Sequence, residues 1–105
     1  MSTTVRDNPE KNRFEIIVDD KVAGWEDYRL GDGVIDLVHT EIGEEYAGQG
    51  LAKILVVDVL AQVRERGLSV KPYCPYVRRV IDKDQESYLD LVRPEDRAEF
   101  DLPAA

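Results

Sequence analysis

Short apolar-rich segments separated by turn residues dominate the first part of the chain. Three segments rich in β-branched and aromatic residues, Phe14–Val18, Val22–Leu30 and Val34–Ile42, have the composition and length typical of strands. Short turn sequences, Asp19-Asp20 and Gly31-Asp32-Gly33, separate them. Strands joined by turns this short pair antiparallel, so the pattern predicts an antiparallel sheet.

The apolar period changes after this sheet. From Leu51 to Arg66 apolar residues recur at spacings of three and four, which predicts a helix. Val56 and Val57 widen its apolar stripe, so we expect the helix to be packed deeply. Gly67 follows basic residues and marks the helix end. We then expect a short strand that lies parallel to the third strand, with the helix as crossover, over Leu68–Lys71.

The two ends of the chain have weaker patterns. Residues 1–12 lack periodicity and contain Asn8-Pro9, so we predict a flexible N-terminal arm and a single domain over residues 13–105. Pro75 occupies the first turn of a predicted second helix that runs to Lys83. We expect two further elements, a short strand over Leu89–Val92 and a helical turn over Pro94–Phe100.

The composition is that of a globular, acidic protein. Of 105 residues 43% are apolar, and 22 acids outweigh 14 bases to give a net charge of −8. This charge disfavours nucleic-acid phosphates and favours cations such as polyamines or basic peptides, although acids also simply keep a domain soluble. No apolar run approaches the roughly 20 residues that span a bilayer. The one cysteine, Cys74, fits a reducing compartment, so we expect a cytoplasmic protein with no membrane partner.

The segment between the third strand and the long helix carries candidate chemistry. Gly48 and Gly50 precede the helix, where a missing side chain lets the backbone approach an anion closely. Free N–H groups and the positive dipole of a helix N-terminus complete a phosphate cradle. A Walker A loop needs Lys and then Ser or Thr after its second glycine, but Gln49-Gly50 follows Gly48. A dinucleotide fingerprint needs glycine at Lys53 and a parallel sheet, so neither alternative fits.

The remaining pattern resembles the pyrophosphate loop of the GNAT N-acetyltransferases, which reads Arg or Gln, two residues, Gly, any residue, then Gly or Ala. Gly48-Gln49-Gly50 matches the second half of that pattern, whereas Glu45 departs from it. The chain from Phe14 to Val92 is similar to small GNAT-like proteins in four blocks: Val38–Ile42, Gly48–Ala52, Cys74–Val77 and Ser87–Val92.

This resemblance implies an α/β (α+β) fold, a three-layer sandwich of a mostly antiparallel mixed sheet with helices on both faces. It implies acetyl-CoA as co-substrate, an amine as acceptor, and no metal. The residues expected to bind acetyl-CoA are Thr40, Ile42, Tyr46, Gly48, Gln49, Gly50, Leu51 and Ala52. Bases near the cradle are candidates for the 3′-phosphate of CoA, or else solvated helix faces: Lys53, Arg78, Arg79 and Lys83.

Four side chains are candidates for the transfer itself. The resemblance implies a part for Cys74, as a nucleophile whose thiolate the helix dipole favours; a small, inert core residue is the alternative. His39, the one histidine, is a candidate base or a packed core residue on the face of Ile35 and Leu37. Glu41, on the same predicted face, is a candidate to accept the proton of the amine or to hold its ammonium group. Tyr88 is a candidate to protonate the departing CoA thiolate, or a packing residue.

Two functions remain open at this point. The first is an acetyl-CoA-dependent N-acetyltransferase that acts on an unidentified small amine, polyamine or protein amine, directly or by way of Cys74. The second is a non-catalytic acyl-CoA-binding or protein-interaction domain, which the small size of the chain favours. A thiol redox sensor ranks last, because Cys74 has no resolving cysteine. A monomer and a homodimer are both compatible with the sequence.

Overall fold

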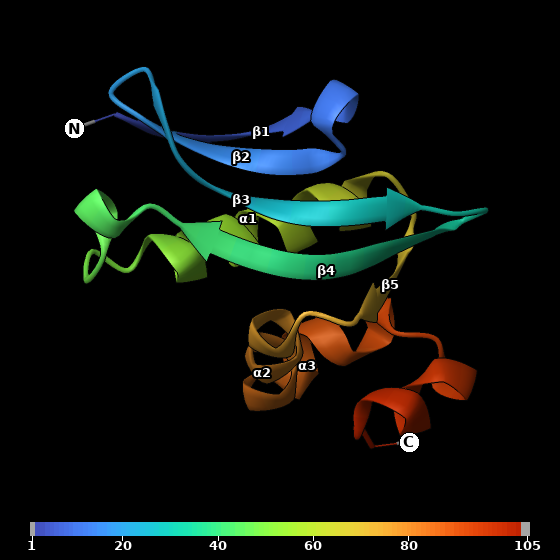
Figure 1. Ribbon diagram of the computed structural model, residues 1–105. Helices are drawn as coiled ribbons and strands as arrows, with labels where there is room; N and C mark the ends of the chain where they lie inside the picture. The colour runs from blue at the N-terminus through green and yellow to red at the C-terminus, as the bar shows by residue number, and fades with distance from the viewer. Residues whose placement is uncertain (1, 104–105) are drawn as a thin grey trace.

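A five-stranded sheet organises the computed structural model, which describes residues 2–103. Its strands lie in the order of the chain (Figure 1). Neighbours from β1 to β4 pair antiparallel, whereas β4 and β5 are parallel. The predicted fold class and the mostly antiparallel mixed sheet are confirmed. The strands are β1 (Thr3–Asn8), β2 (Arg13–Val18), β3 (Lys21–Leu30), β4 (Val34–Ile42) and β5 (Ser69–Pro72).

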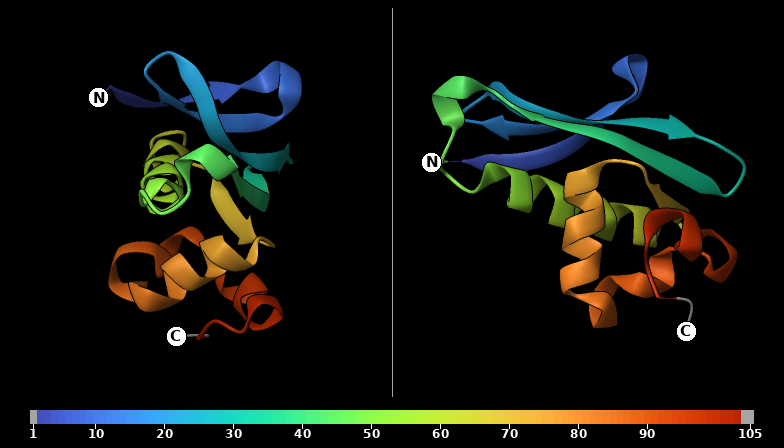
Figure 2. Two further views of the ribbon diagram at one scale, coloured as in Figure 1. Left: turned by 60° about the vertical axis from the view of Figure 1, so that its left-hand side comes forward. Right: turned by 60° about the horizontal axis from the view of Figure 1, so that its bottom comes forward.

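The helices are placed unequally around this sheet. Helix α1 (Leu51–Glu65) lies along one face and contacts all five strands. Helix α2 (Pro75–Lys83) contacts α1, β4 and β5, and α3 (Gln85–Tyr88) follows it beside the β5 edge (Figures 1 and 2). In the part of the chain that is described, no helix is long and apolar enough to cross a membrane. Four 3-10 segments complete the fold, Pro9–Lys11, Glu44–Tyr46, Leu89–Leu91 and Pro94–Phe100.

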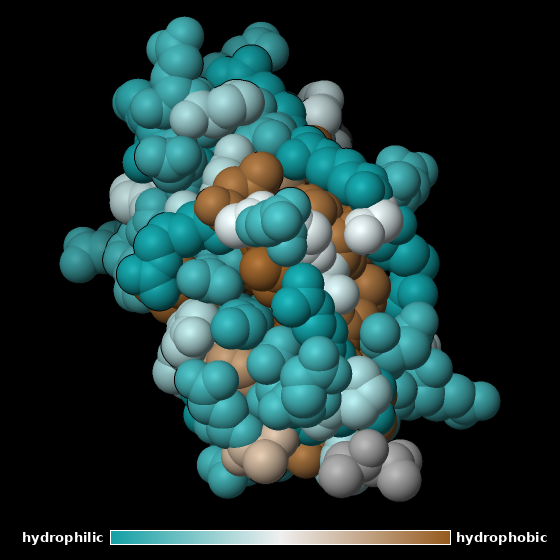
Figure 3. Space-filling model, turned by 90° about the vertical axis from the view of Figure 1, so that its right-hand side faces the viewer, coloured by the Kyte–Doolittle hydropathy of each residue, from teal (hydrophilic) through white to brown (hydrophobic). Residues whose placement is uncertain are grey.

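The core lies between α1 and the sheet. Deep packing of α1 is confirmed, since Leu55, Val56, Val59 and Val63 are all 0% exposed. The helix ends at Gly67, whose φ of 71° lets the next N–H donate to the Val63 carbonyl oxygen at 3.2 Å. Outside the core the surface is mainly hydrophilic, with an apolar band across the end of the molecule shown in Figure 3.

The prediction of a flexible arm over residues 1–12 is wrong for residues 2–12. Met1 lies outside the described residues. Thr3–Asn8 forms β1, an edge strand in full register with β2. Asp7 fastens it, because its carboxylate accepts a 2.7 Å hydrogen bond from the Tyr28 hydroxyl and lies 2.9 Å from the Arg66 guanidinium. Asn8-Pro9 only starts the turn between the two strands. These partners are distant in the chain, which is why local periodicity missed the strand.

The predicted strand over Leu89–Val92 is also wrong. Leu89–Leu91 is a 3-10 turn, whereas the helical turn over Pro94–Phe100 is confirmed. Arg97 donates hydrogen bonds to the carbonyl oxygens of Leu89 (3.1 Å) and Val92 (2.9 Å). In a strand, these oxygens would instead accept from a neighbouring strand. Burial of the apolar side chains here therefore comes from a tight turn and not from a sixth strand.

Candidate active site

A β-bulge in β4 decides which side chains face α1. The pairing of β4 with β3 shifts by one residue at Val38, between Leu37 and His39. Leu37, before the bulge, is fully buried on the α1 face, whereas His39, after it, is 56% exposed. Glu41 follows His39 outward and is 49% exposed. The prediction that these two residues share the apolar face of the strand is therefore wrong.

Beyond the bulge, one edge of β4 has no strand beside it within residues 2–103. Strand β5 ends at Pro72, which pairs with Leu37, but β4 continues to Ile42. The Gly43 N–H donates to the Ala23 carbonyl oxygen at 2.8 Å, which directs the main chain at Gly43 toward β3. Alternation along the strand therefore points the main-chain groups of Thr40 and Ile42 into the space that β5 vacates. This arrangement directs main-chain donors and acceptors to a place where an amide-bearing ligand could pair with them.

Cys74 lies where β4 and β5 separate. Its N–H donates to the Leu37 carbonyl oxygen at 2.8 Å, which continues the β5 side of the ladder by one more bond. It is the N-cap residue of α2, with Pro75 in the first turn, and it is 2% exposed. Its Sγ lies 3.1 Å from the Thr40 Oγ1. The bulge thus brings Thr40, and not His39 or Glu41, to the thiol.

A buried carboxyl completes this cluster. Thr40 Oγ1 donates a hydrogen bond to Glu26 Oε1, and Glu26 is 0% exposed. Burial raises the pKa of Glu26 to about 7, despite hydrogen bonds from Thr40 and from the main chain of His39. No motif in the sequence singles out Glu26, because it lies among the polar residues of β3. The available signal was its spacing of two from Tyr28, which places both on one face of the strand.

The predicted phosphate cradle is formed by main chain at the start of α1. Gly48 and Gly50 have φ of 81° and 74°, a conformation that other residues adopt at a cost. Gly50 is the N-cap residue and supplies no side chain to bond the first N–H groups of the helix. Leu51 anchors this end in the core, Ala52 and Tyr46 are partly buried, and Gln49 is exposed. The geometry fits an anion held by main-chain donors.

A basic pocket adjoins the cradle. It has a volume of about 380 Å³, and we call it the Lys53 pocket; its lining residues are Lys53, Tyr76, Arg79, Val80, Lys83, Asp84 and Tyr88. Three bases against one acid suit a phosphate group. The structure therefore brings together three of the four predicted bases, and it places Tyr88 with them and not at Cys74.

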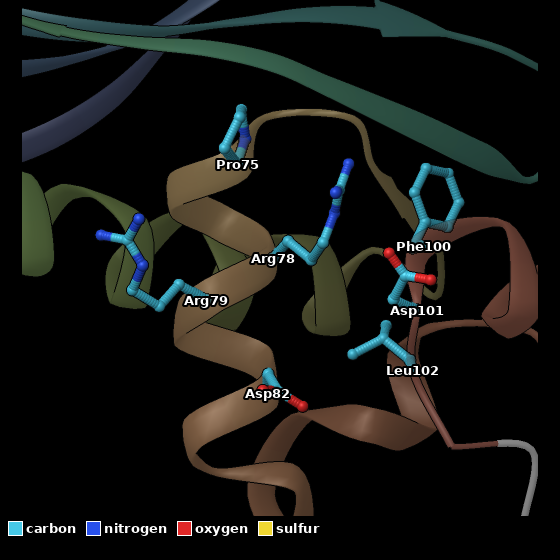
Figure 4. Close-up of a pocket in the computed structure, with 7 residues that line it drawn as sticks. All are labelled: Pro75, Arg78, Arg79, Asp82, Phe100, Asp101 and Leu102. Carbon is cyan, nitrogen blue, oxygen red and sulfur yellow. The ribbon is translucent and has the colours of Figure 1, made fainter.

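The fourth base, Arg78, lines a different pocket. This pocket, of about 260 Å³, lies between α2 and the C-terminal segment, and Figure 4 shows Arg78 directed between that helix and Phe100. The Arg78 guanidinium lies 5.7 Å from the centre of the Phe100 ring. Asp82 and Asp101 also line the pocket, so its charge is mixed. Pro75, the residue after Cys74, also lines this pocket.

His39 and Glu41 form a pair on the outer face of the sheet. His39 Nε2 lies 2.9 Å from Glu41 Oε1. Neither side chain has a hydrogen bond to the side chain of Cys74 or Glu26 in the described structure. Within residues 2–103 no three side chains of the metal-ligating kinds form a group that could hold a metal ion.

Comparison with known proteins identifies the family of this chain. A family model described as GCN5-related N-acetyl-transferase matches residues 13–91. The chain belongs to the GCN5-related N-acetyltransferase (GNAT) family. This confirms the resemblance and makes the chain an N-acetyltransferase-family domain. Members of the family generally transfer acetyl from acetyl-CoA.

Individual relatives agree with the family assignment. Protein NATD1 of Mus musculus and that of Homo sapiens are each 32% identical to the chain over 66 residues, which is 62% of this chain. The match spans 60% of the mouse protein and 58% of the human protein. A GCN5-like putative N-acetyltransferase from Staphylococcus aureus, solved by NMR, is 26% identical and superposes with a TM-score of 0.62, covering 86% of this chain and 87% of its own.

Proposed function

We propose that this domain transfers acetyl from acetyl-CoA to an amine, with Cys74 as the intermediate acceptor. The observation that carries the proposal is the contact between Cys74 Sγ and Thr40 Oγ1, at 3.1 Å, where β4 and β5 separate. Cys74 is the N-cap residue of α2, the end of the helix where the dipole favours negative charge. A thioester lying along the open edge of β4 would place its carbonyl beside this sulfur.

Acetyl-CoA binding follows from three neighbouring features. The pantetheine amides pair with the main chain of Thr40 and Ile42 on the open edge of β4. The pyrophosphate lies on the N–H groups of Gly48–Ala52, with Gln49 and Tyr46 at its rim. The 3′-phosphate enters the Lys53 pocket. In this arrangement Tyr88 lines the phosphate end, which favours a packing role over proton donation to the thiolate.

The amine approaches from the opposite face of the sheet. His39 and Glu41 project there, at the same end of β4 as the thiol. A carboxylate and an imidazole on this face attract a cationic amine and accept its proton before attack. The net charge of −8 adds a long-range attraction for polyamines, lysine side chains or basic peptides.

The test is the intact mass of the protein after incubation with acetyl-CoA. We expect one acetyl adduct on the native chain and none on Cys74→Ala, because Cys74 is the one cysteine. Ile54→Ala, at a position 45% exposed on α1, is the control and should keep the adduct. Absence of the adduct together with acetylated amine product would reject the Cys74 route in favour of direct transfer, and absence of CoA binding would reject the function.

A non-catalytic acyl-CoA-binding domain is the second candidate. The observation that favours it is the burial of the thiol, which is 2% exposed and so depends on the open edge of β4 for access. Calorimetry that finds acetyl-CoA binding, combined with no release of CoA across a panel of amines, would establish this alternative.

A further inference from the structure

Two buried carboxyls in this fold, Glu15 and Glu26, have opposite electrostatic surroundings. Glu15 faces away from α1 and lies 2.9 Å from Arg13 and 3.7 Å from Arg6. Burial alone would raise the pKa of Glu15, but Asn8 and these arginines together hold it below its usual value. Glu26 has no arginine or lysine partner in the part of the chain that the structure describes, and its Oε2 has no hydrogen-bond partner there. A buried carboxyl without an arginine or lysine partner, separated from a thiol by one hydroxyl, needs an explanation other than stability.

Glu26, Thr40 and Cys74 form one unbroken chain of hydrogen bonds. The Thr40 hydroxyl lies between Glu26 Oε1 and Cys74 Sγ, and it has a single proton to donate. When Glu26 is ionised, Thr40 donates to it and accepts from the thiol. When Glu26 is neutral, its own O–H donates to Thr40, which then donates to the sulfur and stabilises a thiolate.

We propose that Cys74 and Glu26 share one proton through the hydroxyl of Thr40, so that Glu26 stores the thiol proton while the sulfur acts as nucleophile. The thiol proton passes to Thr40 Oγ1 as the hydroxyl proton of Thr40 passes to Glu26 Oε1. The net charge of the buried cluster is unchanged in this step. Ionising the thiol alone would add a charge to the buried cluster, which is costly, whereas this step adds none.

This inference rests on the proposed function for its role in transfer. Thiolate attack forms the bond from Cys74 Sγ to the acetyl carbon and breaks the bond from that carbon to the CoA sulfur, which leaves as thiolate and takes a proton from solvent. Attack by the neutral amine then forms the amide, releases one proton to solvent and returns the thiolate. Glu26 gives back the stored proton through Thr40. Among the neighbours of Glu26, Asp27 raises its pKa and His39 lowers it.

The experiment measures the rate at which iodoacetamide alkylates Cys74 between pH 5.5 and 9, with no CoA present. In a shared pair the thiolate fraction stops rising once the pair has lost one proton, because pH no longer changes the partition between sulfur and carboxyl. The native rate should therefore rise through pH 7 and then change by no more than about twofold between pH 7.5 and 8.5. Glu26→Gln should lose this levelling and rise several-fold over that interval.

Matched variants separate the relay from simple structure. Thr40→Val should lower the alkylation rate between pH 7.5 and 8.5 by about 10-fold, since it removes a hydrogen bond to a charged sulfur. Thr40→Ser keeps the hydroxyl and should keep the native rate. Glu15→Gln, a change at the other buried carboxyl, should keep the levelling. A folded Glu26→Gln with the native profile would overturn the proposal, as would a native thiol that stays unmodified throughout. Levelling without any acetyl adduct would keep the shared proton and reject only the Cys74 route.

Discussion

Replacing Glu26 by glutamine should change how stability depends on pH. The folded protein holds the proton of Glu26 more tightly than the unfolded chain, because burial raises the pKa from 4.5 to about 7. Between these values the folded state binds more protons, so the free energy of unfolding falls as pH rises. The stabilisation that the protonated Glu26 gives to the folded state is fully present below pH 4.5 and is lost as the pH rises through 7. At 1.36 kcal/mol for each pH unit, the loss is about 3 kcal/mol.

Urea unfolding followed by far-UV circular dichroism, at pH 4.5 to 8, measures this effect. A glutamine side chain cannot ionise, so the stability of Glu26→Gln relative to the native chain should increase by about 3 kcal/mol over that range. Subtracting one curve from the other cancels all groups that titrate in both proteins. Glu15→Gln is the control: the pKa of Glu15 is lowered, so its contribution is lost only on acidification below pH 4.5. A difference between native and Glu26→Gln that stays within about 0.5 kcal/mol would refute the reasoning.

Five further substitutions test the packing and the cradle. Gly24→Ala should destabilise the fold by about 1–3 kcal/mol in thermal unfolding, because the new methyl would overlap the main-chain oxygen of Glu41 in β4. Gly50→Ala and Gly67→Ala should each cost about 1 kcal/mol, since both glycines have positive φ and open space around them, but only Gly50→Ala should also weaken acetyl-CoA binding in calorimetry. Leu55→Ala should cost about 2–5 kcal/mol in urea unfolding, whereas Ile54→Ala, at a position 45% exposed on the same helix, should be nearly neutral.

Local patterns predicted most of the elements that position the site. The bounds of β4 and the start of α1 follow from period and from the glycines between them, because strand and helix periodicity are properties of short segments. The same holds for α2, where Pro75 sets the first turn. The errors lie where the partner is distant: β1 depends on contacts of Asp7 with Tyr28 and Arg66, and the turn at Leu89 depends on Arg97.

The candidate site was predicted in part for the same reason. The glycines of the Gly48–Ala52 cradle form a local motif whose chemistry is visible in the residues themselves, whereas the roles expected of Cys74 and Thr40 came from the resemblance to the GNAT family. Glu26 has no motif, and its importance comes from burial and from the absence of an arginine or lysine partner within the described chain. Only the three-dimensional arrangement distinguishes it from Glu15, which looks equally plain in the sequence.

The bulge at Val38 is the feature that joins these observations. Without the extra residue, alternation from Leu37 would turn His39 toward α1 and leave Thr40 on the outer face. With it, Thr40 lies between a buried carboxyl and a buried thiol, at the point where β5 leaves the sheet. A buried carboxyl without an arginine or lysine partner among residues 2–103 costs stability above neutral pH, and such groups are concentrated at functional sites. The same unpaired Glu26 should therefore govern both the pH dependence of folding and the reactivity of Cys74.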